Sequence, residues 1–379
     1  MADILLYGDT QRSAALRHEL PISIPDPFLY AEVGGQAYVM CTFLESAQIT
    51  DVRPDAKLLD VDELGFYELL GSGLKRDELW LELTSRVAAA TGVSEAIVDF
   101  EFPLGVAERL RADGISLTVD EAPFSIRRRV KSEHEMAGIR RAQLAAEAGM
   151  AAAAEMLRRA EPVDGILHVD GRALLAEQVR DALRTACAEL GAPAPPSVIV
   201  ASVKQGAGHE SGTGPLPAGL PIQVDLWPRD EESECWADMT RTFVVGGEPT
   251  EEVRRQEQLV REAIEAARAT IAPGVTGREL HQITCDVFER EGYRTQRTGP
   301  ADDPVEGFQF SLGHGVGLRV HEDPGLGMAS LEPLVAGDVL AIEPGLWDRD
   351  IGGVRFEDLV VVTDGGCETL TEYSYSLTP

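Results

Sequence analysis

The stretch FQFSLGHGVGLRVHEDPGLG, residues 308–327, places two of the chain's seven histidines, His314 and His321, among closely spaced glycines. Apolar residues alternate with other residues on both sides of His314, as they do in a strand: Phe308, Phe310, Leu318 and Val320. Glycine lets the backbone pass close to another group. A glycine-dense strand that carries imidazoles therefore indicates a place where the backbone approaches something closely.

Acidic residues interrupt four other strand patterns of the chain. They are Asp225 in PIQVDLW, Asp238 at the start of ADMTRTFVV, Glu343 in VLAIEPG and Glu357 in GVRFEDLVVV. Burial of an unpaired carboxylate is costly, so an acid within an apolar strand requires a compensating partner.

The segments that carry these acids follow a weak internal repeat. Helical patterns at 133–160 and 172–190 precede the strand patterns PSVIVAS, PIQVDLW and TRTFVVGG. Helical patterns at 250–271 and 276–291 precede FQFSLG, DVLAIEPG and GVRFEDLVVVT. Two helix–helix–strand–strand halves predict a pseudo-twofold α+β domain, with its helices packed on one face of a curved sheet. In such a domain the four acids, two from each half, converge with His314 at the centre.

A cluster of four carboxylates and one imidazole suits divalent metal ions. It offers too many ligands for one four-coordinate zinc ion, but it fits two ions that share bridging carboxylates. The oxygen-rich donor set favours Mn²⁺, with Co²⁺ or Zn²⁺ as alternatives. Each residue also has a structural alternative when it is considered singly: a turn or cap residue for Asp225, a hairpin cap for Asp238, a solvent-facing strand end for Glu343, a partner of Arg355 for Glu357, and a core histidine for His314.

The chain before residue 130 follows a different pattern of strands and helices. Strand patterns DILLYGD, EAIVDF and ISLTVDE alternate with helical patterns DELWLELTSRVAAATG and PLGVAERLRADG. Gly34 and Gly35 join two further strand patterns in a predicted hairpin. We expect residues 1–130 to form a smaller α/β domain and residues 131–379 to form the α+β domain. Capping boxes, Ser132 with Glu135 and Thr276 with Glu279, predict where two helices of the larger domain begin.

Several of these motifs resemble those of the M24 metallopeptidase family, which has the pita-bread fold. The resemblance rests on GHGVGLRVHE, LAIEPG, GVRFEDLVVVT and DMTRTFVVG, and it covers essentially the whole chain. The Xaa-Pro aminopeptidase and prolidase branch is the better match, because the shorter peptidases lack an N-terminal domain. The resemblance implies a creatinase-type N-terminal domain followed by a pita-bread catalytic domain.

By this resemblance, five residues hold two divalent metal ions: Asp225, Asp238, His314, Glu343 and Glu357. Asp238 and Glu357 would bridge the ions. Asp225 would bind one ion, and His314 with Glu343 would bind the other. Glu343 would also take the proton from the bridging water, which yields hydroxide.

Three further residues match family positions near the substrate. His321 would contact the carbonyl side of the scissile bond, and His209 would lie near the leaving nitrogen. Arg355 would orient the ligand carboxylates or the substrate. The alternatives are a solvated loop histidine for His209 and simple pairing with a ligand for Arg355. The chain departs from the family at Trp227, where a glycine is usual, and this departure leaves the substrate open.

The composition disfavours several classes of partner. The net charge is −30, from 34 basic and 64 acidic residues, which disfavours nucleic acid and anionic lipid. The five cysteines are scattered without a CxxC pair, and the sequence shows neither a signal peptide nor an apolar run of membrane-spanning length. We therefore expect a cytoplasmic protein that binds neither nucleic acid nor membrane.

Together the motifs predict a dinuclear metallopeptidase that hydrolyses the Xaa-Pro bond at the N-terminus of peptides or in dipeptides, through metal-activated hydroxide with Glu343 as base. The alternatives are a creatinase-type C–N hydrolase of a non-peptide substrate and a non-catalytic pita-bread binding module, and the intact ligand set disfavours both. We also expect a homodimer, because the resembled branch often walls its substrate cleft across a dimer.

Overall fold

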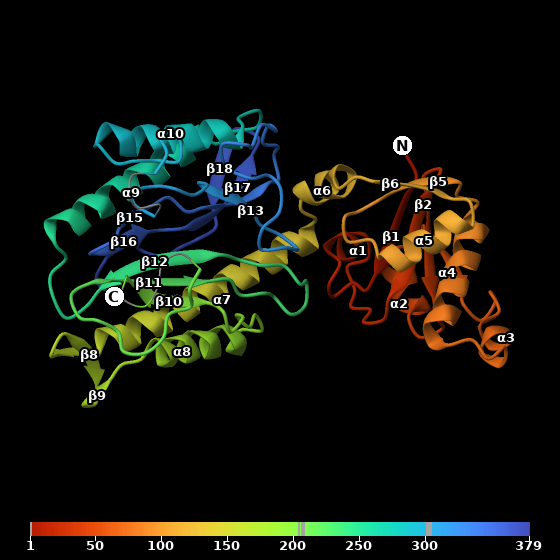
Figure 1. Ribbon diagram of the computed structural model, residues 1–379, viewed down its shortest axis with the longest axis horizontal. Helices are drawn as coiled ribbons and strands as arrows, with labels where there is room; N and C mark the ends of the chain where they lie inside the picture. Colours follow the sequence, from red (N-terminus) through yellow and green to blue (C-terminus); the bar gives the residue numbers. More distant parts are fainter. Residues whose placement is uncertain (1, 204, 206–208, 301–304) are drawn as a thin grey trace. The chain divides into compact units, whose positions relative to one another are not determined.

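The computed structural model describes residues 2–203, 205, 209–300 and 305–379. The chain folds into two compact units, one ending at Arg128 and the other starting at Arg129 (Figure 1). No helix in these described ranges combines the length and the apolarity that a membrane span requires.

The first unit is a mixed sheet accompanied by helices. Its elements, with α6 running across the boundary to the second unit, are β1 (Ile4–Gly8), α1 (Ala14–Glu19), β2 (Phe28–Val33), β3 (Gln36–Cys41), α2 (Ser46–Val52), β4 (Lys57–Asp60), α3 (Phe66–Gly71), α4 (Arg76–Thr91), β5 (Glu95–Val98), α5 (Leu104–Ala112), β6 (Ser116–Val119) and α6 (Ala122–Arg129). The sheet has the order β4-β3-β2-β1-β5-β6. β2 pairs antiparallel with β1 and β3, and the three other pairs of the sheet, β1–β5, β3–β4 and β5–β6, are parallel. The hairpin prediction is confirmed, since Gly34 and Gly35 both turn the chain at positive φ between β2 and β3.

The second unit contains two helix pairs and several short sheets. Its elements are α7 (Glu133–Arg158), β7 (Glu161–Val163), β8 (Ile166–Val169), β9 (Arg172–Ala173), α8 (Ala176–Glu189), β10 (Ile199–Ser202), β11 (Pro221–Leu226), β12 (Met239–Val244), α9 (Glu251–Thr270), α10 (Gly277–Arg290), β13 (Gly313–Gly315), β14 (Val339–Ile342), β15 (Gly345–Asp348), β16 (Gly352–Arg355), β17 (Asp358–Thr363) and β18 (Gly366–Thr369). The sheets have the orders β10-β11-β12, β13-β14-β17-β18, β15-β16 and β7-β8-β9. Within this unit, α7 and α8 lie on one side of the central strands and α9 and α10 lie on the other (Figure 1).

Local sequence signals explain where the long helices begin and how closely they pack. The capping boxes at Ser132 and Thr276 are both formed, so the starts of α7 and α10 are as predicted. The alanine-rich α7 packs closely on α8 at Gly149, where a Cβ would lie 2.6 Å from Sγ of Cys187. A larger residue at this position would therefore push the two helices apart.

The structure corrects three predicted elements. Helix α8 begins at Ala176 instead of residue 172, because residues 172–173 pair with β8 as the short strand β9. The predicted strand FQFSLG is wrong: Gly307 turns the chain at φ 85°, and Phe308 packs its ring between Phe288 and Phe310 in the core. The predicted strand GVRFEDLVVVT is two strands, β16 and β17, which are separated at residues 356–357.

Candidate metal centre

Five strands or strand ends of the second unit carry the predicted ligands. Asp225 lies in β11, opposite Thr240 of β12, and Asp238 directly precedes β12. His314 is the central residue of β13. Ile342 of β14 pairs with Asp358 of β17, so the residues just beyond this pair, Glu343 and Glu357, are also neighbours. The amide of Glu357 donates to the carbonyl of Thr240 at 3.1 Å, which joins the two halves of the repeat at the site.

The structure brings these side chains together. Three groups have ligand atoms within 4.8 Å of one another: Asp225, Asp238 and Glu357; His314, Glu343 and Glu357; and Asp238, His314 and His321. The groups overlap, since Asp238, Glu357 and His314 each belong to two of them. All five predicted ligands therefore form one continuous cluster, which His321 joins from outside.

The carboxylates of this cluster need a cation. Burial, reinforced by the neighbouring carboxylates, raises the pKa of Asp238 and of Glu357 well above the usual range of a carboxyl group. Burial raises the pKa of Glu343 to about 7, although Arg355 acts in the opposite direction. Oδ1 of Asp238 is buried and has no hydrogen-bond partner among the described residues. A divalent ion would supply both the missing charge and the missing partner, so the residues fit a metal.

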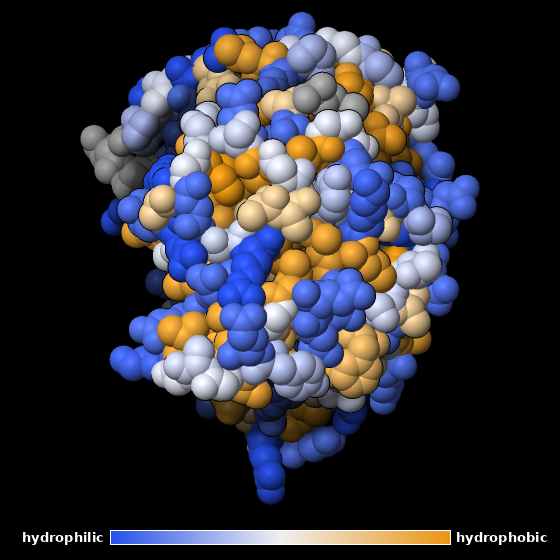
Figure 2. All heavy atoms as spheres, turned by 90° about the vertical axis from the view of Figure 1, so that its right-hand side faces the viewer, coloured by the Kyte–Doolittle hydropathy of each residue, from blue (hydrophilic) through white to orange (hydrophobic). Residues whose placement is uncertain are grey.

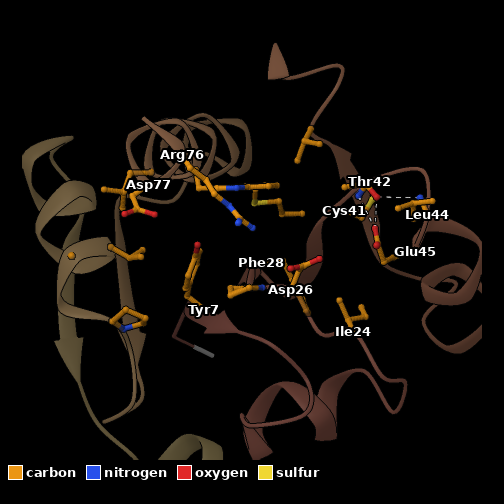
Figure 3. A pocket seen from close by; sticks show the side chains of 18 of the residues that line it. Tyr7, Ile24, Asp26, Phe28, Cys41, Thr42, Leu44, Glu45, Arg76 and Asp77 are labelled. Atoms are coloured by element: carbon orange, nitrogen blue, oxygen red, sulfur yellow. Dashed lines mark hydrogen bonds between the residues drawn. The ribbon is translucent and has the colours of Figure 1, made fainter. Parts of the chain in front are cut away.

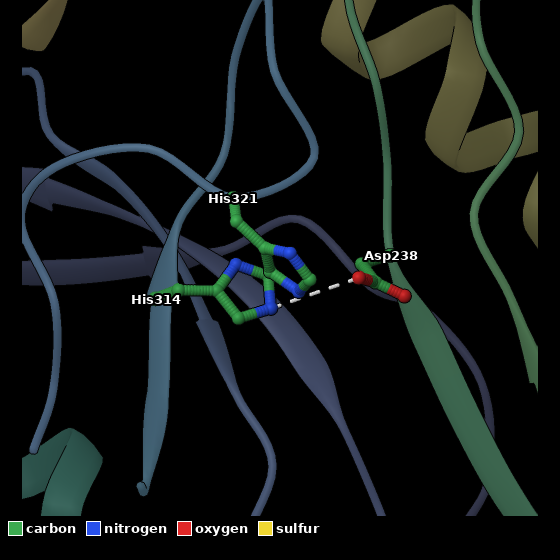
Figure 4. Close-up of side chains that lie close together, drawn as sticks. All are labelled: Asp238, His314 and His321. Atoms are coloured by element: carbon green, nitrogen blue, oxygen red, sulfur yellow. Dashed lines mark ion pairs between the residues drawn. The ribbon is translucent and has the colours of Figure 1, made fainter. Parts of the chain in front are cut away.

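His314 is oriented as a neutral donor. Its Nδ1 lies 3.1 Å from the carbonyl oxygen of Gly315, which accepts its proton. Nε2 then carries the lone pair and points to Asp238, 3.7 Å from its Oδ2 (Figure 4). The same nitrogen lies 3.6 Å from Oε1 of Glu343. Burial, followed by the neighbouring His321, lowers the pKa of His314 to about 3, which keeps the lone pair available.

Arg355 provides the positive charge closest to the carboxylates. Its guanidinium forms an ion pair with Asp225 and lies 3.4 Å from Oε2 of Glu343, so it contacts acids of both halves. It also donates to Oγ1 of Thr240 at 3.2 Å, and that hydroxyl donates to Oε2 of Glu357 at 2.7 Å. The arrangement holds three ligand carboxylates in fixed positions. Among the described residues, the guanidinium of Arg355 is the one that lies beside the four acids Asp225, Asp238, Glu343 and Glu357.

The two other predicted histidines lie at the outer side of the cluster. His321 is exposed, and its ring meets that of His314 edge-on with 4.2 Å between the ring centroids. Burial of part of the ring, followed by the charge of His209, lowers the pKa of His321. His209 is exposed, and residues 206–208 of its loop lie outside the described part of the chain.

The glycines of the opening stretch allow a close approach of the backbone, as the sequence indicated, and the group they approach is other backbone. A Cβ on Gly313 would collide with the carbonyl oxygen of Ala341 in β14. A Cβ on Gly315 would lie 2.6 Å from the carbonyl oxygen of Asp323, in the segment that returns after His321. The glycines thus let backbone pack on backbone, and this packing holds His314 in place.

Sequence reasoning missed several residues that support the site. Arg241 of β12 is fully buried and donates to the carbonyl of Glu357 at 2.7 Å and to Asp358 at 2.8 Å. Lys131 forms a buried ion pair with Glu322, the residue after His321. An arginine in the apolar strand MTRTFV was a usable signal, because a buried guanidinium requires acceptors. Nothing in the sequence pairs Lys131 with Glu322.

Comparison with known proteins agrees with this geometry. Residues 137–364 match metallopeptidase family M24. The Xaa-Pro dipeptidase of Pyrococcus furiosus is 38% identical over 136 residues, which is 36% of each chain. The uncharacterized peptidase YqhT of Bacillus subtilis is 38% identical over 135 residues, 36% of this chain and 35% of that protein. The chain thus matches about a third of the length of these relatives.

Solved structures share the fold over the whole chain. The prolidase from Pyrococcus horikoshii OT3 is 24% identical with a TM-score of 0.75, covering 100% of this chain and 95% of that one. The X-Pro aminopeptidase from Thermotoga maritima is 21% identical with a TM-score of 0.77, covering 98% and 96%. The predicted pita-bread fold with a preceding α/β domain is therefore confirmed. Since the family match spans more than half of the 379 residues, the chain belongs to metallopeptidase family M24.

Proposed function

We propose that this chain is a dinuclear metal-dependent peptidase that hydrolyses the Xaa-Pro bond at the N-terminus of peptides or in dipeptides. The overlap of the three donor groups carries the proposal: Asp238 and Glu357 each belong to two groups, and each carboxylate has two oxygens with which to bridge two ions. His314 also belongs to two groups, but its Nδ1 donates to the carbonyl of Gly315, so Nε2 alone can bind one ion. Asp225 would complete one ion's shell, and His314 with Glu343 would complete the other. The oxygen-rich set favours Mn²⁺.

The bound ions would act as Lewis acids on the scissile carbonyl and would acidify water near neutral pH. Glu343 is the carboxylate best placed to accept that proton. Its side chain is 16% exposed, compared with 7% for Asp225 and 8% for Asp238, so it borders the space that water and substrate reach. In this proposal Glu343 holds the proton on a carboxylate oxygen and passes it to the leaving nitrogen.

The exposed histidines would act on the substrate. His321 touches His314 and faces outward, which suits a donor to the scissile carbonyl. His209, whose charge lowers the pKa of His321, would lie at the leaving nitrogen. Arg355 would orient Asp225 and Glu343 and would not itself touch substrate, because its guanidinium is occupied by these acids.

The Xaa-Pro specificity draws support from relatives whose names carry it, the Xaa-Pro dipeptidases of two Pyrococcus species. They share about a third of their length with this chain, so the substrate is part of the proposal. A creatinase-type hydrolase and a non-catalytic binding module remain the rival functions. The complete donor set argues against both, since neither requires two metal ions.

The test is a hydrolysis screen of the Mn²⁺-loaded protein with Ala-Pro, Leu-Pro, Ala-Pro-Gly and proline-free peptides of matched length, combined with metal analysis. We expect two ions per chain and cleavage of the Xaa-Pro bond alone. Asp238→Asn should lose both properties. Glu368→Gln, an exposed acid of β18 outside the donor groups, is the matched control and should keep them. Two bound ions without any peptide cleavage would refute the peptidase proposal.

We also propose that the chain forms a homodimer. Among the described residues, the three donor groups all lie in the second unit, so the first unit adds no metal ligands of its own. Its part in the function would then be to assemble the dimer. Light scattering at micromolar concentration checks this, and a fully active monomer would contradict it.

A further inference from the structure

The first unit contains a cavity that the peptidase proposal does not use. Its volume is about 500 Å³, and all of its lining residues lie between residues 7 and 106. This volume falls within the range of small-molecule sites. The donor groups of the metal centre all lie in the second unit, so the cavity shares no residue with them.

The interior of the cavity is apolar. Buried side chains from the sheet and its helices form most of the lining: Phe28, Met40, Ile49, Val61 and Val106. The half-buried Trp80 of α4 adds an aromatic wall. An apolar side chain of a ligand would lose its contact with water here, which favours binding by about 25 cal/mol for each Å² that it buries.

Charged groups converge at the mouth. Arg76, at the start of α4, reaches over the cavity toward the hydroxyl of Tyr7, and Asp26 lies across from it (Figure 3). Neither the side chain of Arg76 nor that of Asp26 has a hydrogen-bond or ion-pair partner within the part of the chain that the structure describes. Asp77 is a second exposed acid in the lining. One positively charged group, on Arg76, and negatively charged carboxylates, on Asp26 and Asp77, are therefore available to a ligand.

The balance of charge selects the ligand. The described lining has one cation, Arg76, and three acids, of which Glu45 already accepts a hydrogen bond from the amide of Thr42 at 3.1 Å. An apolar acid would meet Arg76 but would be repelled by the free carboxylates of Asp26 and Asp77. An apolar amine would meet these carboxylates but would be repelled by Arg76. A molecule with both charges satisfies all of them.

Two observations define what kind of site this is. Burial, followed by the nearby carboxylates, raises the pKa of the Cys41 thiol to about 12, so the lining holds no ready nucleophile at this position. Apolar surface continues outside the cavity at Phe43, Leu44 and Leu104, which are 70%, 66% and 72% exposed. Figure 2 shows apolar side chains gathered in the middle of the face that this unit presents. The site thus favours binding over chemistry, and it has room for a ligand longer than one residue.

We propose that this cavity is a second, non-catalytic site that binds an apolar amino acid or a short apolar peptide as a zwitterion. The side chain enters the apolar interior, the carboxylate pairs with Arg76, and the ammonium group pairs with Asp26. The ligand belongs to the chemical class that a peptidase consumes and releases, but the proposal stands on the cavity alone and holds whether or not the chain cleaves peptides.

Isothermal titration of the metal-loaded protein tests this proposal. The probes are L-phenylalanine, L-phenylalanyl-L-alanine, 3-phenylpropionate, which lacks the ammonium group, and phenethylamine, which lacks the carboxylate. We expect one phenylalanine per chain, with each single-charge analogue at least about tenfold weaker, because each loses one charge-assisted interaction. A dipeptide that binds more tightly than phenylalanine would identify a peptide as the ligand, and the reverse order would identify a free amino acid.

Variants locate the binding. Arg76→Gln should weaken phenylalanine at least about tenfold, and Asp26→Asn should weaken it similarly. Arg111→Gln is the matched control, an exposed arginine of the same unit outside the lining, and it should bind as the parent does. Because Arg76 is exposed, its loss should leave the melting temperature unchanged. Unchanged binding in Arg76→Gln, or no saturable binding at about 10 mM ligand, would overturn the proposal. A change of oligomeric state in Arg76→Gln without any ligand binding would also overturn it, in favour of an interface between two copies.

Discussion

Arg241 is expected to be the most sensitive structural residue of the second unit. It is fully buried in β12, and its guanidinium donates five hydrogen bonds: to the carbonyls of Thr240, Glu357, Tyr373 and Ser374 and to Oδ1 of Asp358. The ring of Tyr375 lies 4.9 Å from its central carbon. The residue therefore ties β12 to the junction that carries Glu357 and to the C-terminal segment.

The expected loss of stability in Arg241→Met follows from the groups that lose their partner. Methionine keeps most of the volume of the side-chain stem but removes the charge. The side chain of Asp358 is 3% exposed and, among the described residues, would keep only the hydroxyl of Tyr375 as a side-chain partner. Breaking a buried ion pair from one side costs about 3–5 kcal/mol. The carbonyls of Tyr373 and Ser374 are partly exposed and can bind water, so we expect a total loss within that range.

Guanidinium chloride unfolding measures this loss in the unit concerned. A Trp80→Phe background restricts the fluorescence signal to the second unit, which holds the other three tryptophans: Trp227, Trp236 and Trp347. The double variant Arg241→Met/Asp358→Asn removes both charges. It should therefore be more stable than the sum of the single losses implies, by about 1–3 kcal/mol. A loss below about 1 kcal/mol in Arg241→Met, or strict additivity in the double variant, would refute the reasoning.

Four further predictions concern the centre and the first unit. His314→Ala should lose one metal ion and most activity while the fold survives; elemental analysis that still finds two ions per chain would remove His314 from the ligand set. Glu343→Gln should keep much of the metal but lower turnover far more than substrate binding, which steady-state kinetics separates. Trp227 follows the end of β11 and is half-buried, so Trp227→Gly tests whether its indole narrows the cleft. The ratio of kcat/KM for substrates with a bulky first residue over those with a small first residue should rise. An unchanged ratio with a lower Tm would mean that the indole only packs. Burial raises the pKa of Glu19, but hydrogen bonds from Arg127 and Arg53 outweigh burial and lower this pKa overall. The ionised Glu19 therefore stabilises the folded state near neutral pH, and this contribution is lost as the pH falls through the folded-state pKa. Glu19→Gln should therefore destabilise the first unit at pH 7 and much less in acid, as pH-dependent unfolding would show.

Local patterns in the sequence were sufficient for the fold class and for several element boundaries. Alternating apolar residues, capping boxes and glycine turns depend on neighbours within a few positions, so the starts of α7 and α10 and the hairpin at Gly34 could be read directly. Acids in apolar strands were conspicuous because their burial requires a partner, and the structure brings all four together with His314. Their role as metal ligands stays a prediction.

The contacts that fix the centre came only from the tertiary structure, because they join residues more than 100 positions apart. Arg355 reaches Asp225 across the repeat, and Arg241 reaches Asp358, in ways that no local pattern encodes. The break between β16 and β17 at Glu357 exists because that residue bonds to Thr240 of the other half. The cavity of the first unit was invisible in the sequence for the same reason: a hollow is a property of how side chains from separate elements meet, and each of its lining residues alone looks like ordinary core or ordinary surface.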